Sequence, residues 1–270
     1  MHNEGTCAYQ AWERCRNGAA GMEGRERETG DKGRREKGES GSMGRITGLE
    51  EIGHVPPKVR QMYGAVIELL EEGMDMEDIR VSTITERAGI GKGTAYEYFD
   101  TKDEIVACAV VSQIRWMFGW LGEQLEAKAD FGEQLSFLLD VVEKKGHCSH
   151  SFLRFVHAMT SNSEFNRMIR EKMNAEEFAA YRPANVFGRI LRQGVERGAI
   201  RRDLPIEYMI HCVFSHLLSY MMEIATKDCF RMDAQSLRPF VYRGIMGELC
   251  GGYFSRGAES IIDNCAKRRN

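Results

Sequence analysis

The chain has 270 residues, of which 43% are hydrophobic, and its formal net charge is −3. This length suits one large or two modest domains with a buried core, and the charge excludes a strongly basic protein that binds nucleic acid by charge alone. No stretch reaches the roughly eighteen unbroken apolar residues of a membrane span, and the N-terminus lacks the apolar run of a signal peptide. We therefore expect a cytoplasmic protein without a membrane partner.

The first 45 residues differ in composition from the rest. From residue 17 to 45 they are nearly all Gly, Glu, Arg, Lys and Ser, without apolar periodicity, which predicts a disordered tail. The tail can be interpreted as a basic arm along DNA, as a flexible linker, or as sequence upstream of a natural start at Met43. Nine basic against eight acidic residues up to Arg45 argue against the arm, and we favour the third interpretation.

An amphipathic helix is predicted over residues 58–72. Pro56 and Pro57 suit its start and Gly73 suits its end. Its apolar residues recur at intervals of three and four, as on a helix with one buried face: Val59, Met62, Tyr63, Val66, Ile67, Leu69 and Leu70.

Two short helices follow, with the layout of a helix-turn-helix. The first runs from Val81 and stops at Gly89-Ile90-Gly91, and the second runs from Lys92 to about Phe99. A Gly-containing turn of three or four residues between two brief helices sets the second helix into the major groove of DNA. Ala95 and Phe99 lie four residues apart and can pack inward. The outward positions offer an ammonium, a bare backbone N–H, a hydroxyl and two phenols to phosphates and base edges: Lys92, Gly93, Thr94, Tyr96 and Tyr98.

The string AGIGKGTAYEYFDTK from Ala88 to Lys102, together with the preceding helix, resembles the N-terminal domain of the tetracycline-repressor (TetR) family of bacterial transcriptional regulators. Arg80 stands where family members commonly have a Thr or Ser that caps the helix and touches phosphate. Ser82 or Thr83 is expected to take that role, since Thr83 with Glu86 is typical of a capping box. Tyr98 replaces a frequent His. The expected DNA contacts are Arg80, Ser82, Thr83, Lys92, Gly93, Thr94, Tyr96, Tyr98 and Lys102.

The predicted DNA-binding domain, residues 55–102, is not basic. From Arg45 to Asp103 there are seven Lys or Arg against twelve Asp or Glu. Non-specific affinity for DNA scales with the number of phosphates neutralised. We therefore expect specific binding with weak non-specific affinity.

The remainder, residues 103–260, predicts a larger helical domain and hence an all-α protein. No alternating strand pattern occurs, and turn signals separate the helices. The expected helices cover residues 101–129, 131–145, 149–159, 164–180, 184–197, 205–225 and 235–255.

By its resemblance to the family, this second domain is expected to hold a small-molecule pocket and to form a homodimer through its last two helices, 205–225 and 235–255. The alternative is that the apolar faces of these helices are intramolecular core. Candidate ligand-binding residues combine large apolar side chains with two imidazoles that could orient a ligand: Trp116, Trp120, Phe152, Phe155, His157, Met159, Phe187 and His211.

A metal- or thiol-dependent sensor is the competing hypothesis. His147, Cys148 and His150 lie close in sequence, but their spacing is that of no known zinc module. The eight cysteines show no C-x-x-C pair and favour reduced thiols. Motifs of nucleophilic, zinc-protease and P-loop enzymes are lacking, so we expect neither an enzyme, a metal nor a cofactor.

By its resemblance to the family, the chain is expected to be a ligand-responsive transcriptional regulator. It is expected to act as a repressor, to bind a pseudo-palindromic double-stranded operator as a dimer, and to be released by a small-molecule inducer. The two recognition helices of such a dimer meet successive major grooves about 34 Å apart.

Overall fold

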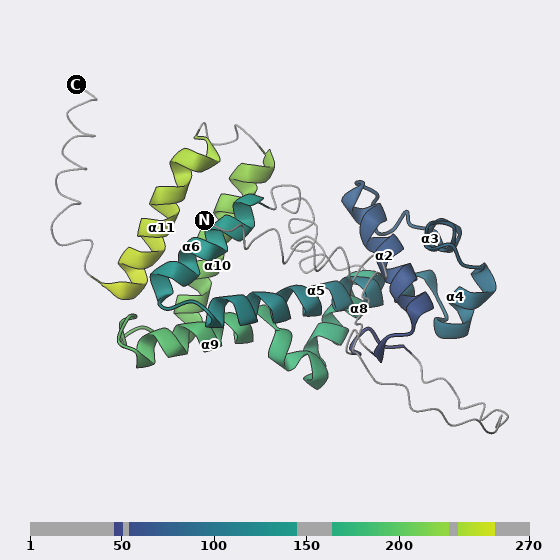
Figure 1. The fold of residues 1–270 in the computed structure, drawn as a ribbon, viewed down its shortest axis with the longest axis horizontal. Helices are drawn as coiled ribbons and strands as arrows, with labels where there is room; N and C mark the ends of the chain where they lie inside the picture. The colour runs from purple at the N-terminus through teal and green to yellow at the C-terminus, as the bar shows by residue number, and fades with distance from the viewer. Residues whose placement is uncertain (1–45, 51–53, 145–163, 227–231, 252–270) are drawn as a thin grey trace, which may run out of the picture. The chain divides into compact units, whose positions relative to one another are not determined.

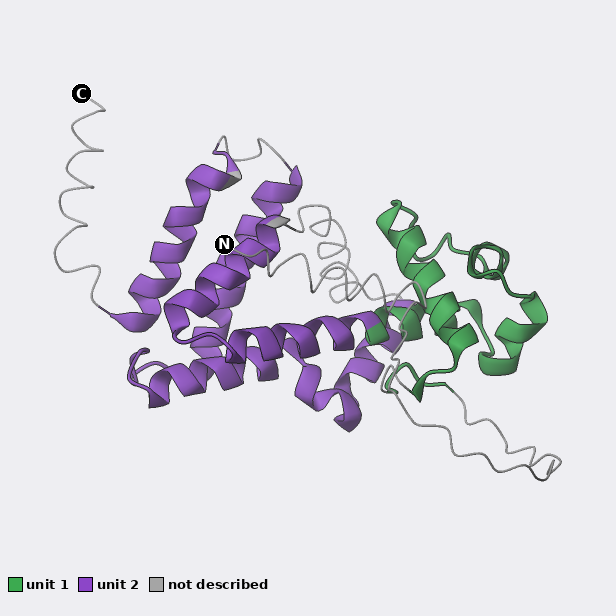
Figure 2. Cartoon of the chain, viewed as in Figure 1, with its two compact units in different colours: residues 1–112 green, residues 113–270 purple. Residues whose placement is uncertain are grey.

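The structure is a computed structural model, and it describes residues 46–50, 54–144, 164–226 and 232–251 (Figure 1). Every regular element within these ranges is a helix, which confirms the expected all-α class. The chain divides into two compact units, residues 1–112 and 113–270 (Figure 2). The division falls within helix α5 (Lys102–Glu126), so the N-terminal unit continues past the boundary expected at residue 102.

The N-terminal unit is built from α2 (Pro57–Glu71), α3 (Val81–Ala88), α4 (Lys92–Tyr98) and the first turns of α5. Each bound lies within one residue of the expected one. The helices enclose a core of side chains at most 1% exposed: Val59, Met62, Val66, Leu69, Ile79, Ile84, Ala95, Phe99 and Ile105. Burying each large side chain contributes about 1.5 to 3 kcal/mol, so this apolar face is what holds such short helices in place.

Gly89 ends α3 in the left-handed conformation, with φ 65°, which a glycine adopts at little cost. The start of α3 differs from the expected one. The N-cap is Arg80, without a side-chain cap, so Thr83 lies inside the first turn and the predicted capping box is wrong. The buried hydroxyl of Thr85 instead donates to the carbonyl oxygens of Val81 and Ser82, at 2.9 and 3.1 Å.

The segment Ile46–Glu50 packs against α5, so the folded unit begins before the expected residue 55. Ile46 is only 6% exposed, and Gly48 lies directly on the backbone of Cys108. A Cβ at Gly48 would come within 2.7 Å of the Cys108 Cα, and the φ of 79° also disfavours any other residue. Residues 46–50 are therefore part of the folded unit and pack on α5. We call this segment the α5 strap.

Two truncations separate the α5 strap from the preceding tail. Removing residues 1–42 is expected to leave thermal stability and operator affinity unchanged. Extending the deletion through residue 50 removes the buried Ile46 side chain and is expected to lower the free energy of unfolding by about 2 kcal/mol. Urea denaturation and DNA binding measure both. A tenfold loss of affinity on removing residues 1–42 would support the DNA-arm interpretation instead.

The C-terminal unit contains the rest of α5, then α6 (Phe131–Lys144), α8 (Glu164–Asn174), the 3₁₀ helix η2 (Glu176–Tyr181), α9 (Pro183–Glu196), α10 (Ile206–Thr226) and α11 (Ala234–Cys250). Helices α10 and α11 pack side by side, with α6 against both and α9 against α10 (Figure 1). The helix expected over 149–159 lies outside the described residues.

One expected helix, 164–180, is broken in two at Ala175, whose backbone is extended with φ −60° and ψ 148°. Its cause lies further along the chain. The Arg182 guanidinium donates to the carbonyl oxygens of Met173, Asn174 and Ala175, at the C-terminal end of α8. These carbonyls lack partners at any helix end, so the cation that binds them stabilises the termination.

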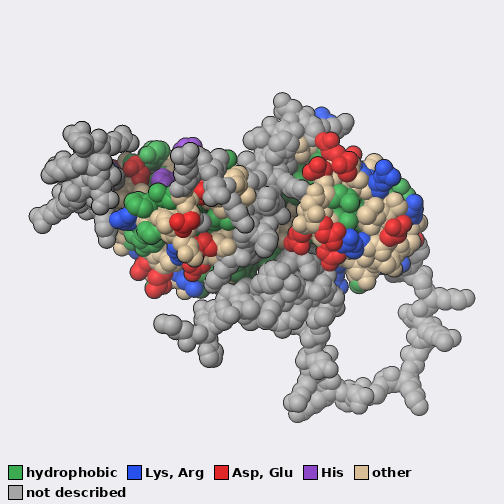
Figure 3. Space-filling model, turned by 90° about the horizontal axis from the view of Figure 1, so that it is seen from above, with side chains coloured by type: hydrophobic (Ala, Val, Ile, Leu, Met, Phe, Trp, Pro, Cys, Tyr) green, Lys and Arg blue, Asp and Glu red, His purple; other side chains and the backbone are tan. Residues whose placement is uncertain are grey.

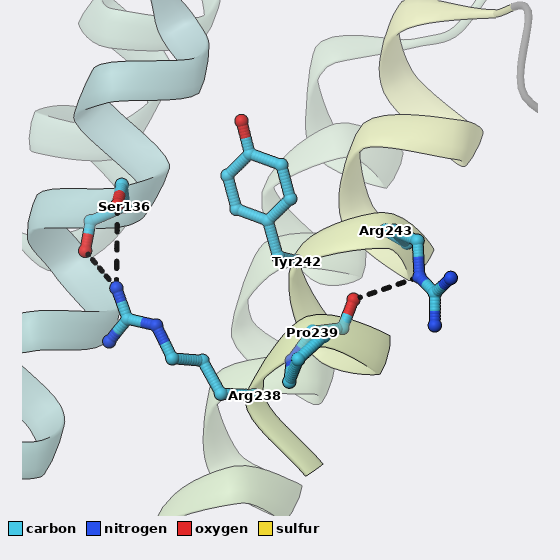
Figure 4. A pocket seen from close by; sticks show the side chains of 5 residues that line it. All are labelled: Ser136, Arg238, Pro239, Tyr242 and Arg243. Carbon is cyan, nitrogen blue, oxygen red and sulfur yellow. Dashed lines mark hydrogen bonds between the residues drawn. The ribbon is translucent and has the colours of Figure 1, made fainter. Parts of the chain in front are cut away.

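A polar network connects α6, α10 and α11. Arg238 of α11 pairs with Asp140 at 2.7 Å and with Glu143 at 2.8 Å. Figure 4 shows its third contact, in which the guanidinium donates to the Ser136 carbonyl oxygen at 3.2 Å. Tyr220 of α10, fully buried, donates its hydroxyl to Glu143. Burial, and then this hydrogen bond, raise the pKa of Tyr220 above its ordinary value.

Helix α5 is long and apolar enough to cross a membrane by length and composition alone, although no such span was expected from the sequence. Within its most apolar window 67% of the helix is buried inside the protein. Central core helices have the same composition, and the burial of α5 matches that role.

Candidate nucleic-acid interface

The exposed surface of the helix-turn-helix forms an open groove. Side chains from the loop before α3, from α4 and from the starts of α3 and α5 line it: Glu77, Asp78, Ile79, Arg80, Val81, Ser82, Lys92, Tyr96 and Lys102. Five of the nine expected DNA-contacting residues meet in this groove, namely Arg80, Ser82, Lys92, Tyr96 and Lys102. We call it the α3–α4 groove.

The buried face of helix α4 is the one that the sequence predicts. Ala95 is 0% and Phe99 1% exposed, so one face is fixed in the core. On the other face Tyr96 is 56% exposed, a large aromatic side chain placed in solvent. Lys92 and Gly93 are also exposed, whereas Thr94 and Tyr98 are half-buried. A helix fixed on one face, with a phenol and an ammonium on the other, is suited to insertion into a major groove.

Helix α3 contributes fewer residues to the groove than expected. Arg80 is exposed beside the N-terminus of α3, and Ser82 is half-buried on the wall of the groove. Thr83 is half-buried and is not among the residues that line the groove.

Two basic residues of this unit are engaged within the protein. Lys102 donates to the Glu77 carbonyl oxygen at 3.0 Å and pairs with Asp103 at 2.9 Å. Arg87 makes a two-pronged bond to Glu72, at 2.6 and 2.9 Å. That bond lowers the pKa of the Glu72 carboxyl. Within the described part of the chain, Arg80 and Lys92 are the basic side chains of the groove that form no ion pair.

Acidic side chains share the same surface. Glu77 and Asp78 are exposed on the wall of the groove, and neither was expected at the site from the sequence. Figure 3 shows acidic and basic side chains interspersed over the face of the N-terminal unit that it draws. The sequence shows the excess of acidic residues and places many of them in the loop from Glu71 to Asp78, but it does not show that this loop lines the groove.

The candidate ligand-binding residues belong to the C-terminal unit and form two described groups. Trp116 and Trp120 stack with ring centroids 6.3 Å apart, and Phe137 lies 6.0 Å from Trp120. Phe187, 5% exposed, packs edge-on against Phe214 at 4.9 Å. His211 is exposed on α10. The remaining candidates, Phe152, Phe155, His157 and Met159, lie outside the described residues.

The competing metal hypothesis has no support in the described part of the chain. His147, Cys148 and His150 fall outside it, and within it no group of three or more His, Cys, Asp or Glu could hold a metal ion. Cys212 and His216 come together on α10, with Sγ and Nδ1 3.9 Å apart. The same Nδ1 lies 2.9 Å from the Cys212 carbonyl oxygen, an ordinary contact within one helical turn.

Comparison with known proteins agrees with this geometry. The family model "Bacterial regulatory proteins, tetR family" matches residues 67–108, from the last turn of α2 into α5. The "Fatty acid metabolism regulator protein" of Bacillus subtilis (strain 168) is 25% identical over 158 residues, which is 58% of this chain and 78% of that protein.

Solved structures share the fold. The transcriptional regulator FadR of Bacillus subtilis, in complex with stearoyl-CoA, superposes with a TM-score of 0.53 at 20% identity, covering 69% of this chain and 96% of that one. A transcriptional regulator of Saccharomonospora viridis, in complex with choline, gives 0.56 at 14% identity, covering 72% and 98%.

Proposed function

For this chain, a DNA-binding transcriptional regulator of the TetR family, we propose the role of a cytoplasmic repressor that binds a pseudo-palindromic operator as a homodimer and is released by a small-molecule effector. The observation that carries the proposal is the α3–α4 groove, where Arg80, Lys92 and Tyr96 stand exposed together on a helix-turn-helix. Phosphate contacts from the two cations position the protein, and contacts of α4 with base edges select the sequence.

A long-chain acyl-CoA is the proposed effector. The support is the relative at 25% identity, whose name refers to fatty acid metabolism, and the neighbour in the same fold that holds stearoyl-CoA. A second neighbour holds choline, so the fold alone does not select the ligand. The half-buried tryptophans and Phe137 supply apolar surface of the kind that an acyl chain binds.

The test uses the full chain and a labelled duplex from the region upstream of its own gene. We expect tight binding that stearoyl-CoA weakens at least tenfold, which corresponds to about 1.4 kcal/mol of coupling between the two sites. Free CoA and choline are the controls and should leave the affinity unchanged. Release by choline but not by stearoyl-CoA would contradict the acyl-CoA assignment, and absence of DNA binding would contradict the repressor role.

The proposed dimer uses the outward faces of α10 and α11. Three large apolar side chains are exposed there: Tyr208 at 44%, Met222 at 39% and Phe240 at 54%. Leu217 is 6% exposed and faces the core of its own unit. A charge at Leu217 is thus expected to unfold the unit, whereas a charge at Met222 or Phe240 tests the interface.

Met222→Glu and Phe240→Glu together are expected to convert the dimer to a folded monomer. In a two-fold symmetric interface each substitution occurs on both subunits, so each one buries two unpaired charges. Sedimentation measures the mass and circular dichroism the fold. Ala184→Glu, at an exposed position of α9, is the matched control and should remain dimeric. A folded dimer of the double variant would place the interface on another surface.

A further inference from the structure

The α3–α4 groove carries charges of both signs, and the two signs differ in how they are bound. Lys102 has two partners inside the protein. By contrast, the carboxylates of Glu77 and Asp78 are exposed and have neither a hydrogen bond nor an ion pair within the described part of the chain. The groove therefore presents two unneutralised carboxylates on the surface where Arg80 and Lys92 would meet phosphate.

Hydrogen bonds hold the backbone that carries these two acidic residues. The Lys102 ammonium holds the Glu77 carbonyl oxygen at 3.0 Å, and the Asp78 N–H donates to the Asp75 carbonyl oxygen at 3.0 Å. The loop that bears them is thereby tied to the start of α5 on one side and closed into a turn on the other. Because the backbone is held, both acids stay beside the groove when DNA arrives.

We propose that Glu77 and Asp78 repel the phosphate backbone and so lower the affinity of this protein for all DNA sequences alike. The inference rests on the proposed function, since it assumes that the α3–α4 groove faces DNA. Duplex DNA carries about one negative charge per 1.7 Å of its axis, and at low salt a charge acts over a Debye length of about 10 Å or more. Carboxylates on the wall of the groove lie within that range of any bound duplex.

This repulsion has a definite consequence for binding. Non-specific affinity comes almost entirely from neutralised phosphates, whereas specific binding adds contacts with base edges. Two acids oppose Arg80 and Lys92, so phosphate contacts contribute little to the binding free energy. The lifetime of the complex at a site then depends on the contacts of α4 with bases. The repulsion sets the absolute affinity and leaves discrimination between bases to Thr94 and Tyr96.

The test neutralises the two carboxylates without changing their shape. The full-length double variant Glu77→Gln, Asp78→Asn is titrated with a labelled random-sequence 30-bp duplex from 50 to 200 mM salt. Its matched control is Glu176→Gln, Glu177→Gln, an adjacent pair of exposed acids on η2 in the other unit, which changes the net charge equally.

At 50 mM salt the groove variant is expected to bind the random duplex about tenfold more tightly than the wild type, or about 1.4 kcal/mol, because four carboxylates are removed per dimer. The gain should shrink towards 200 mM as salt screens the repulsion. The control should stay within about twofold of the wild type. Equal gains in both variants, no gain, or weaker binding by the groove variant would each overturn the proposal.

Failure of the proposed function gives a different pattern. In that case the wild type and both variants bind neither the random duplex nor the duplex from upstream of the gene at 50 mM salt, which overturns both ideas. Should the double variant melt at a lower temperature than the wild type, Glu77→Gln alone is titrated. It is then expected to gain about threefold, and an unchanged affinity would overturn the assignment.

Discussion

Replacing Lys92, Thr94 and Tyr96 together by alanine is expected to weaken operator binding at least a hundredfold, about 3 kcal/mol. Contacts with base edges contribute roughly 1 to 3 kcal/mol each, and the proposed homodimer would lose them in both half-sites. The fold should survive, because Tyr96 is 56% exposed while Ala95 and Phe99, the core anchors of α4, are retained. Fluorescence anisotropy with the upstream duplex measures the loss.

The matched control for this variant is Gln61→Ala, at an exposed position of α2 that does not line the α3–α4 groove. It should bind the operator like the wild type. Both proteins should give the same circular dichroism and the same melting temperature. A folded triple variant that binds the operator at wild-type strength would show that another surface reads the DNA.

Arg238→Ala is expected to destabilise the C-terminal unit by about 2 kcal/mol. Removing a partner from a fully buried ion pair costs about 3 to 5 kcal/mol, and the present network is partly open to solvent, with the Asp140 side chain 44% exposed. Loss of the guanidinium leaves Asp140 and Glu143 as neighbouring carboxylates without their common cation.

Urea denaturation of Arg238→Ala measures this effect against Arg243→Ala on the same helix. The Arg243 side chain points away from Arg238 and donates to the Pro239 carbonyl oxygen at 3.2 Å (Figure 4). It lies over the exposed ring of Phe240 and is itself exposed, so its removal should cost less than about 0.5 kcal/mol. Equal destabilisation by the two variants would show that the ion pairs of Arg238 do not contribute to the stability of the unit.

The helix-turn-helix was predictable because its signals are local. Gly89 stops α3 through a left-handed residue, and the spacing of Ala95 and Phe99 fixes which face of α4 is buried. Each signal acts within one or two turns of the helix that it controls. Such short-range information is present in a single sequence, and the bounds of α2, α3 and α4 follow from it.

The break at Ala175 was not predictable in this way. Alanine favours helix, and the residues from 164 to 180 contain no glycine or proline. The helix ends there because Arg182 collects the terminal carbonyls from seven to nine residues away. A tertiary contact thus overrides the local helix preference, and the amino-acid composition of residues 164–180 does not reveal it.

The candidate site shows the same limit. The outward residues of α4 follow from helical periodicity, whereas the partners of Lys102 and the positions of Glu77 and Asp78 depend on how a loop returns to α5. The excess of acids was visible in the sequence. Glu77 and Asp78 also lie close to Arg80 along the chain, but their place on the wall of the groove was not visible, because loop conformation is set by contacts between distant residues.

The α5 strap packs on Cys108, so the reactivity of this thiol can report local opening of the N-terminal unit. Cys108 is 0% exposed, with its backbone and Cβ against Gly48 and its Sγ facing the Ile46 carbonyl oxygen, and alkylating reagents need an exposed thiolate. The labelling rate of Cys108 therefore reports openings that expose this thiol, and detachment of residues 46–50 from α5 is one of them. Followed in the presence and absence of DNA, it would report whether an occupied DNA-binding unit opens less often than a free one.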